Sequence, residues 1–305
     1  MSQDLASLAS LRIDPRPVLA DISVVIPTLG REILESCLYW MAVSKAWPAQ
    51  IIVVDQGNRL QVKEWLQVLS DAGMKTCYVP SQQRGRAAGI NRGLREVRTH
   101  FVAITDDDCF VDHEWLLKMV TCLRDSPERI FTGRVEPAGK PDVSFCTVTS
   151  HVPVTHIRPE LRIHPLIGGN IGVAMERVRS IGFFDEHPSI SSAEDSDWGY
   201  RALRKGVWIS YKPDIFLYHY NWRDTYQRAD RYRDYSRSQG AFYGKYLLSG
   251  DLLIPLQAMR DLVRGPIRWL RGLVLRNQDM IDRGKADTLE LAGGILAGVR
   301  RRKLM

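Results

Sequence analysis

Cysteine is scarce in this 305-residue sequence, and its few copies are widely spaced with no C-x-x-C pair. They are Cys37, Cys77, Cys109, Cys122 and Cys146. This pattern argues against a disulfide framework and a zinc ribbon, and it suits a reducing compartment. The sequence also lacks a basic-then-apolar leader and any run of about 18 apolar residues. We therefore expect a cytoplasmic protein.

Several enzyme motifs are missing as well. The sequence contains no G-x-S-x-G nucleophile elbow and no P-loop lysine, so the hydrolase and kinase readings lose their main support. Apart from His219, which follows a strand-like segment, the histidines show no metal-ligand spacing.

Acidic residues are too few to balance the basic ones, because 42 Lys and Arg face 35 Asp and Glu, giving a net charge of +7. The surplus lies in residues 223–305, which hold 17 Lys and Arg against 9 Asp and Glu. A nucleic-acid binder more often spreads its basic surface over its core domain. We expect no nucleic-acid partner.

Apolar segments alternate with amphipathic ones along the first third of the chain. The β-branched runs at 22–28, 49–57, 75–80 and 100–105 predict buried strands, and the stretches at 32–45 and 62–73 have helical spacing. This alternation predicts an α/β fold with a mostly parallel, doubly wound, Rossmann-like sheet. Ligands of such sheets bind beyond the carboxyl ends of the strands, where Thr28 and Asp55 lie.

Three consecutive aspartates, Asp106–Asp108, follow the last of these runs. Adjacent carboxylates disfavour one another's ionisation unless a positive charge is present. One interpretation is a solvated turn that caps the helix predicted at 112–123, although Asp112 is itself a suitable cap. The other is a divalent cation, Mg²⁺ or Mn²⁺, because hard oxygen ligands favour these ions over zinc.

Six motifs together resemble glycosyltransferase family 2, which has the GT-A fold. In order along residues 21–222 they are "VVIPTLGR", "IIVVDQG", "GRAAGINRG", "ITDDDC", "GGNIGVAM" and "AEDSDWGYRAL". An acidic triplet alone is common, but the ordered set is specific. The resemblance implies an inverting transfer of a sugar from a nucleoside diphosphate donor, usually a uracil or thymine nucleotide, with a divalent metal on the diphosphate.

The resemblance also implies roles for residues on the donor side. Asp55 matches the acid that reads the nucleotide base, Asp106 the ribose contact and Asp108 the metal ligand, with Asp107 between them facing either way. The remaining matches to the nucleotide pocket and its closing loop are Pro27, Thr28, Arg31, Gly85, Arg86 and Asn91. Taken alone, Arg86 could be a solvated loop residue and Asp55 a loop cap.

On the acceptor side, Asp195 matches the general base of the family, and Glu194 or Asp197 would orient the helix or bind acceptor. The alternative for Asp195 is a capping box with Ser192. Gly168, Gly169 and Asn170 match the segment that lines the acceptor side of the donor sugar, although paired glycines also form plain turns. His219 matches a metal-binding position, and packing among aromatic residues is the alternative.

We divide the chain into a lead-in (1–20), a catalytic domain (21–222) and a basic, largely helical C-terminal region (223–305). Pro255 and Pro266 should break the segment 252–278 into two or three short helices. Residues 252–303 form basic amphipathic stretches, which either pack on the catalytic domain or contact an anionic membrane peripherally, at its inner face. The aromatic and basic segment 224–247 could cover the acceptor cleft or mediate a dimer.

The predicted protein is thus a metal-dependent hexosyltransferase of polysaccharide or glycolipid biosynthesis, acting on a saccharide or lipid-linked acceptor. Two other functions remain open. One is a Mg²⁺-dependent nucleotidyltransferase, which would normally have a basic, glycine-rich loop after the first strand, whereas "PTLGRE" is poor in Gly and Lys. The other is a catalytically inactive scaffold subunit. The sequence predicts neither the sugar, nor the acceptor, nor the oligomeric state.

Overall fold

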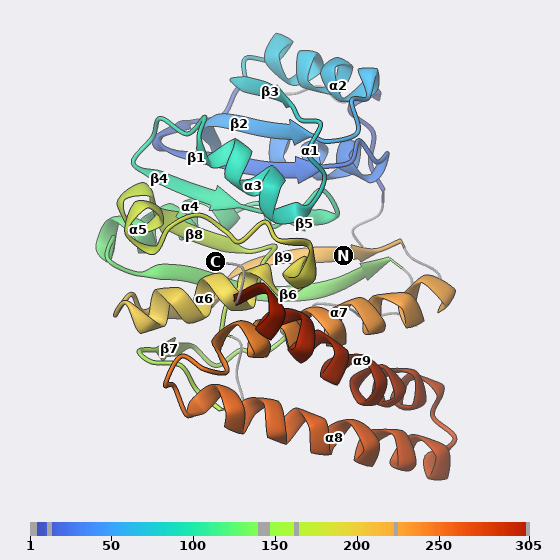
Figure 1. Ribbon diagram of the computed structural model, residues 1–305. Helices are drawn as coiled ribbons and strands as arrows, with labels where there is room; N and C mark the ends of the chain where they lie inside the picture. Colours follow the sequence, from blue (N-terminus) through green and yellow to red (C-terminus); the bar gives the residue numbers. More distant parts are fainter. Residues whose placement is uncertain (1–4, 11–13, 140–146, 162–164, 223–224, 303–305) are drawn as a thin grey trace. The chain divides into compact units, whose positions relative to one another are not determined.

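The computed structural model describes residues 5–10, 14–139, 147–161, 165–222 and 225–302. The chain forms two compact units, each described here by itself (Figure 1). The first comprises Met1–Arg158, Pro165–Phe184 and Arg201–Trp222. The second comprises Pro159–His164, Asp185–Tyr200 and Arg223–Met305.

The first unit is built on a mixed sheet with the strand order β3-β2-β1-β4-β8-β6-β9-β5, and β7 pairs with β9. Its strands are β1 (Val18–Thr28), β2 (Trp47–Asp55), β3 (Thr76–Pro80), β4 (Phe101–Ile104), β5 (Cys109–Val111), β6 (Ile130–Gly139), β7 (Val154–His156), β8 (Ile171–Ala174) and β9 (Ile209–Asn221). β1 to β4 are parallel, whereas β8 runs antiparallel to β4 and β6. The predicted α/β fold with a helical C-terminal region is confirmed, and the sheet is parallel only in its first half and around β6 and β9.

Helices cover both faces of this sheet. They are α1 (Ile33–Ala42), α2 (Leu60–Asp71), α3 (Arg86–Leu94), α4 (Trp115–Asp125) and α5 (Met175–Ile181), and the unit also contains the last residues of α6 (Glu194–Arg204). Ile22, Val24 and Ile26 of β1 share one core with α1, α2 and α4. Val25 points to the opposite face, as alternation along a strand requires, and lies under α3. Burial on both faces explains why β1 is a continuous apolar run.

The lead-in contacts the first helix. A short 3-10 helix, η1 (Leu8–Ser10), follows Ala6, whose amide donates to Ser36 Oγ at 2.9 Å. The amide of Leu8 donates to Glu35 Oε1 at 2.8 Å, and the Leu8 side chain is buried. Of the cysteines, Cys37, Cys77, Cys109 and Cys122 are free, and Cys146 lies outside the described residues.

The second unit is helical. It contains η2 (Pro188–Ile190), the start of α6, and the long helices α7 (Thr225–Tyr246), α8 (Leu253–Leu275) and α9 (Gln278–Arg302). α7 and α9 approach so closely that a Cβ on Gly240 would lie 2.2 Å from Leu291 O, and one on Gly298 would lie 2.2 Å from Ala241 O. Within the described ranges, no helix combines the length and apolar character needed to cross a membrane.

The expectation that prolines break the segment 252–278 was wrong, because α8 is continuous over 23 residues. Pro255 lies in the first turn of α8. Backbone N–H groups there have no acceptor within the helix, so a proline costs no hydrogen bond. Pro266 is interior, but it follows Gly265, which has no Cβ to clash with the proline ring. Gly265 itself packs against α9, where a Cβ would lie 3.0 Å from Thr288 N.

Candidate functional site

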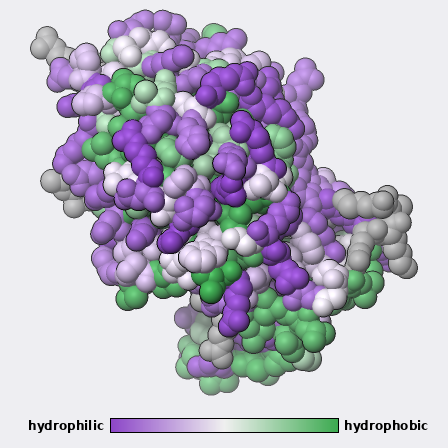
Figure 2. All heavy atoms as spheres, turned by 90° about the vertical axis from the view of Figure 1, so that its left-hand side faces the viewer, coloured by the Kyte–Doolittle hydropathy of each residue, from purple (hydrophilic) through white to green (hydrophobic). Residues whose placement is uncertain are grey.

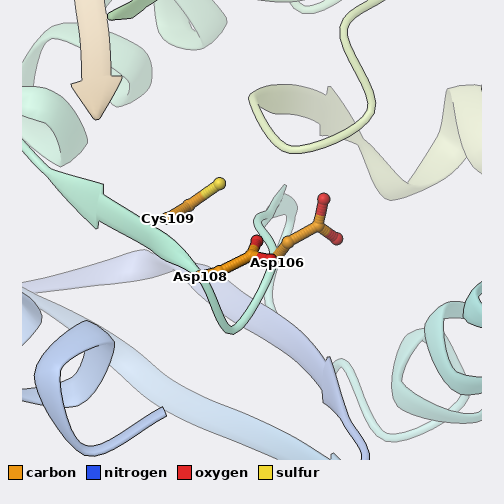
Figure 3. A group of neighbouring side chains, drawn as sticks. All are labelled: Asp106, Asp108 and Cys109. Carbon is orange, nitrogen blue, oxygen red and sulfur yellow. The ribbon is translucent and has the colours of Figure 1, made fainter. Parts of the chain in front are cut away.

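The three aspartates form a tight turn between β4 and β5 (Figure 3). The amide of Cys109 donates to Asp106 O at 3.2 Å, and the amide of Tyr220 donates to Asp108 O at 2.8 Å. β5 pairs antiparallel with β9, so that Cys109 lies opposite His219. This pairing brings a histidine from a distant part of the sequence to the aspartates.

Arginines supply the positive charge that the acidic turn requires. Arg31 forms an ion pair with Asp107, whose carboxylate also accepts a hydrogen bond from Thr28 Oγ1 at 2.6 Å. Arg86 Nε donates to Asp106 Oδ1 at 2.6 Å. Arg31 in turn stacks over the Trp222 ring, with its Cζ 4.9 Å from the ring centroid. The acidic turn is therefore tied to the carboxyl end of β1 and to the start of α3.

Asp107 is the most enclosed of the three carboxylates, with a side chain that is only 1% exposed. Burial raises the pKa of Asp107 to about 6, and the charge of Asp108 acts in the same direction, whereas Arg31 and Thr28 oppose the shift. Asp107 thus ties the turn to the end of β1. Its predicted contact with the donor stays a prediction.

Asp106 and Asp108 form a group that fits a divalent cation. Ligand atoms of Asp106, Asp108 and Cys109 lie within 4.8 Å of one another, and His219 Nε2 lies 3.6 Å from Asp108 Oδ1. The buried His219 Nδ1 has no hydrogen-bond partner among the described residues. The carboxylate oxygens are the hard ligands that suit Mg²⁺ or Mn²⁺, and His219 would add one nitrogen ligand.

Two neighbouring side chains, Trp222 and Cys109, shape this group, and neither was predicted to have a role there. Trp222 Nε1 donates to Asp108 Oδ2 at 3.0 Å and thereby orients the carboxylate. Burial, followed by the charges of Asp106 and Asp108, raises the pKa of the Cys109 thiol well above its ordinary value. The oxygen atoms, and not the sulfur, are therefore the suitable hard ligands. In the sequence, only its position next to the three aspartates could have indicated that Cys109 lies at this site.

Asp55 ends β2 and organises the loop that follows. Its Oδ1 accepts from Gly57 N and its Oδ2 from Arg59 N, both at 2.8 Å, and Tyr78 Oη donates to Oδ2 at 3.1 Å. Next to it, Gln56 Nε2 donates to the carbonyls of Gln83 and Gly85. Hydrogen bonds from Gln56 therefore connect the end of β2 to the loop that contains Gly85. Contact of Asp55 with a nucleotide base stays a prediction.

Two predicted ligand-binding asparagines hold the fold together in this structure. Asn91 Nδ2 donates to Phe184 O at 2.8 Å, and Asn91 Oδ1 accepts from Phe184 N at 2.9 Å. Asn170 Oδ1 accepts from Trp115 Nε1 at 2.9 Å, and its Nδ2 donates to Ile215 O at 3.0 Å. Both side chains are buried, and their contacts with donor or acceptor stay predictions.

The two glycines before Asn170 lie on the loop that approaches the acidic turn. A Cβ on Gly169 would lie 3.1 Å from Asp106 Oδ2 and 3.0 Å from Cys109 Sγ, and Gly168 is buried. Pro27 lies at the end of β1 beneath α3, since a Cβ on Gly89 would be 2.8 Å from its Cβ. The first unit therefore gathers predicted residues from six segments. They are Pro27, Thr28, Arg31, Asp55, Gly85, Arg86, Asp106–Asp108, Gly169 and His219.

The predicted acceptor carboxylates belong to the second unit, at the start of α6. Asp195 is partly exposed, and its Oδ1 accepts a hydrogen bond from Ser196 N at 2.7 Å. Asp197 is fully buried and accepts from Lys245 Nζ at 2.5 Å and from Tyr246 Oη at 2.8 Å. Glu194 is also buried. Asp197 is thus tied to α7, whereas Asp195 retains access to solvent.

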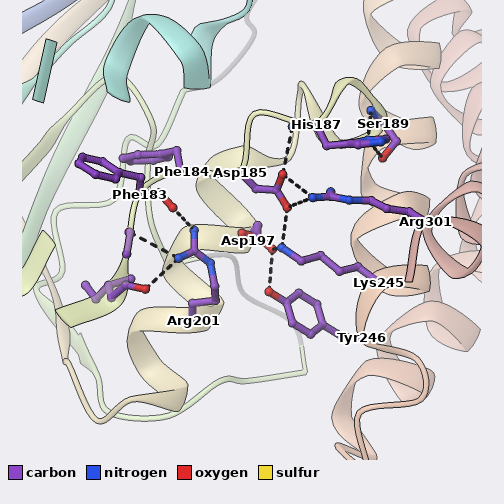
Figure 4. A network of polar contacts seen from close by, with 12 residues as sticks. Phe183, Phe184, Asp185, His187, Ser189, Asp197, Arg201, Lys245, Tyr246 and Arg301 are labelled. Carbon is purple, nitrogen blue, oxygen red and sulfur yellow. Dashed lines mark hydrogen bonds and ion pairs between the residues drawn. The ribbon is translucent and has the colours of Figure 1, made fainter. Parts of the chain in front are cut away.

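Asp185 is a second anchor for the same segment (Figure 4). Lys245 Nζ, which pairs with Asp197, also lies 2.8 Å from Asp185 Oδ2, and Arg301 of α9 approaches Asp185 to 2.7 Å. Burial opposes ionisation of Asp185, but the hydrogen bonds from Arg301 and Lys245 outweigh it and lower the pKa of Asp185. One cation from α7 and one from α9 therefore hold the segment that carries Asp195.

Comparisons with known proteins agree with this geometry. Residues 23–173 match the family described as glycosyl transferase family 2. The glycosyltransferase AglE of Haloferax volcanii is 23% identical over 206 residues, which cover 65% of this chain and 66% of AglE.

Solved structures show the same fold at low identity. The mannosyltransferase PcManGT from Pyrobaculum calidifontis, solved with GDP-Man and Mn²⁺, has a TM-score of 0.60 at 16% identity and covers 92% of this chain, with 89% of its own chain matched. S. aureus TarS 1–349, solved with UDP-GlcNAc, has a TM-score of 0.53 at 16% identity, with 88% of this chain and 90% of that chain covered. These likenesses establish the GT-A fold.

Proposed function

We propose, because residues 23–173 match glycosyl transferase family 2, that this chain transfers a hexose-type sugar, with inversion, from a nucleoside diphosphate sugar of the UDP or dTDP type to an acceptor hydroxyl. The acidic turn carries the proposal. Asp106, Asp108 and His219 lie together at the carboxyl ends of the strands, where ligands of such sheets bind.

Asp108 and His219 would hold the cation, and Asp106, which is predicted to contact the ribose, lies close enough to share it. A bound Mg²⁺ or Mn²⁺ offsets the charge that develops on the departing nucleoside diphosphate. Arg86 adds a positive charge at the same place, since it reaches Asp106 from the start of α3. Thr28 and Arg31 fix Asp107 between the two ligands, so the turn is rigid before donor enters.

Asp195 is the proposed base. It takes the proton of the acceptor hydroxyl while the acceptor oxygen bonds to the anomeric carbon and the bond from that carbon to the diphosphate oxygen breaks. Attack opposite the leaving group inverts the anomeric configuration. The partly exposed position of Asp195 suits contact with an acceptor, in contrast to buried Asp197 and Glu194.

Thermal unfolding with UDP, dTDP and GDP, each with and without Mn²⁺, tests the donor site. A nucleotide at 100 times its dissociation constant stabilises by about 2.7 kcal/mol. We expect a Mn²⁺-dependent shift with UDP or dTDP that Asp108→Asn abolishes and the control Asp21→Asn, a carboxylate paired with Arg124, retains. A shift with GDP alone would overturn the donor type. The absence of any shift would favour a scaffold.

A second experiment separates the base from the donor site. Asp195→Asn should lose sugar transfer but keep the Mn²⁺-dependent nucleotide shift, because it removes proton acceptance and changes no residue of the first unit. Full transfer by Asp195→Asn would refute its role. Release of pyrophosphate from a nucleoside triphosphate and a sugar phosphate would instead identify a nucleotidyltransferase.

We further propose a saccharide or lipid-linked acceptor and a peripheral position at the inner face of the cell membrane. The support is the charge of residues 223–305 and the surface of α8, which exposes aliphatic side chains beside arginines. A lipid-linked acceptor would place the reaction in polysaccharide or glycolipid biosynthesis.

A further inference from the structure

α8 exposes a long row of aliphatic side chains. The two most exposed are Leu252, just before the helix, at 77% and Val274 at 82%. Between them the row continues through Leu256, Met259, Val263, Ile267 and Leu270. Steps of three and four residues place these side chains on one face of a helix. Figure 2 shows apolar side chains gathered at the lower end of the view, where α8 lies.

The helical bundle does not use this face. The buried side of α8 consists of Ile254, Gln257, Ala258, Gly265 and Gly272. Gly265 and Gly272 bring it against α9, where a Cβ on Gly272 would lie 2.8 Å from Ile281 N. The neighbouring helices therefore leave the exposed aliphatic row of α8 uncovered. At 23 residues and 1.5 Å each, α8 is about 34 Å long, and the apolar edge runs along it.

The charges of α8 are distributed unevenly around this edge. Arg260, Arg264, Arg268 and Arg271 follow one another at steps of four, four and three residues, and so they border the row on one side. Arg264 and Arg271 are exposed. Asp261, the single acidic residue in the sequence of α8, turns inward and accepts from Tyr243 Oη at 2.6 Å. The outer surface of the helix is thus apolar and cationic.

We propose that this face of α8 binds the surface of an anionic membrane, with the helix lying parallel to it and the aliphatic row inserted among the lipid head groups and upper acyl chains. Interfacial helices combine such an apolar row with a basic border. The four arginines bar α8 from spanning the bilayer, in keeping with the lack of a spanning helix in the described ranges.

A second copy of the chain is the less suitable occupant. A two-fold interface brings the same patch of both copies together. Two such patches would bring together the exposed Arg264 and Arg271 of both copies, because Arg260 and Arg268 are paired within the chain, with Asp261 and Asp287. Anionic lipid supplies the opposite charge. Membrane binding by α8 does not depend on the proposed function. The idea that it brings a lipid-linked acceptor to the enzyme does rest on that function.

Flotation of the full-length protein tests the proposal, with vesicles of phosphatidylcholine alone and of phosphatidylcholine and phosphatidylglycerol in equal amounts. We expect binding to the anionic vesicles only. Leu256→Gln, Val263→Gln and Leu270→Gln combined should abolish it, and the fold should persist because all three side chains are exposed. Leu289→Gln on α9, an equally exposed leucine, is the matched control and should bind normally.

A second variant tests the contribution of the arginines that border the row. Arg264→Gln with Arg271→Gln should weaken vesicle binding roughly 30-fold, which corresponds to about 1 kcal/mol for each arginine near an anionic surface. Equal binding to neutral vesicles would overturn the role of charge. Failure of the wild-type protein to float would overturn the proposal, as would a dimer in sedimentation velocity that the triple variant disrupts. The nucleotide shift, measured without vesicles, reports separately on the proposed reaction.

Discussion

Replacement of Lys245 by Met should destabilise the second unit strongly. Lys245 Nζ joins two carboxylates, Asp197, with a side chain 0% exposed, and Asp185, at 12%. Met keeps the aliphatic stem but removes the charge, which leaves the Asp197 side chain buried without its cation.

Breaking a buried pair on one side costs about 3 to 5 kcal/mol. We expect about 3 kcal/mol, at the low end, because Tyr246 still donates to Asp197 and Arg301 still pairs with Asp185. Lys45→Met is the matched control. Its ion pair with Glu114 has the same 2.5 Å separation, but the side chains are 60% and 41% exposed, so its loss should change little.

Hydrogen exchange measured by mass spectrometry gives the free energy of opening for peptides from each unit. Peptides covering 185–200 and 240–246 should exchange much faster in Lys245→Met. Adding Asp197→Asn should recover part of the loss, because a neutral amide is less costly to bury unpaired than a carboxylate. If Lys245→Met were as mild as Lys45→Met, the argument from burial would be refuted.

Three further predictions concern pH, helix packing and the metal. The pKa of Asp185 is lowered in the folded protein, so its ionised form contributes stability above the ordinary carboxyl pKa of about 4 and loses that contribution as pH falls through the lower folded value. The stability difference between wild type and Asp185→Asn, followed by urea unfolding, should therefore be constant near neutrality and shrink below roughly pH 4; a difference that grew in acid would contradict this. Gly240→Ala should cost about 1 to 3 kcal/mol, because its Cβ would meet Leu291 O at 2.2 Å. Gly293→Ala in α9, with no described heavy atom within 4 Å of its Cβ, should instead stabilise by about 0.5 to 1 kcal/mol in the same urea titration; equal effects would refute the close-packing account. Trp222→Phe removes the donor to Asp108 Oδ2 and should weaken Mn²⁺ binding about tenfold, read from the Mn²⁺ concentration that gives half of the nucleotide shift. Trp208→Phe, at a 41% exposed tryptophan, should leave that concentration unchanged.

Local sequence predicted the first half of the sheet because each strand there is a buried apolar run. The convergence expected at the carboxyl ends is confirmed in the register, where Thr28 lies opposite Asp55 and Asp55 opposite Pro80. Parallel strands joined by short crossovers leave few other arrangements. The positions of Thr28 and Asp55 could therefore be inferred without coordinates.

Contacts between distant residues were beyond such reasoning. Asp185 and Arg301 are 116 residues apart, and no periodic pattern marks either as a partner of the other. Arg31 was expected to face the nucleotide, and its pairing with Asp107 depends on how β1 and β4 align. The continuity of α8 also escaped prediction, because the effect of Pro266 is moderated by the glycine before it and by packing on α9.

The pairing of β5 with β9 has a consequence for the order in which the protein is made. The first four strands lie within 104 residues, but Cys109 pairs with His219, which is synthesised 110 residues later. At about 5 to 20 residues per second, the ribosome needs roughly 5 to 20 s to cover that stretch. During this interval the aspartate turn has neither its partner strand nor its histidine. Of the residues proposed to hold the divalent ion, His219 is therefore the last to be synthesised.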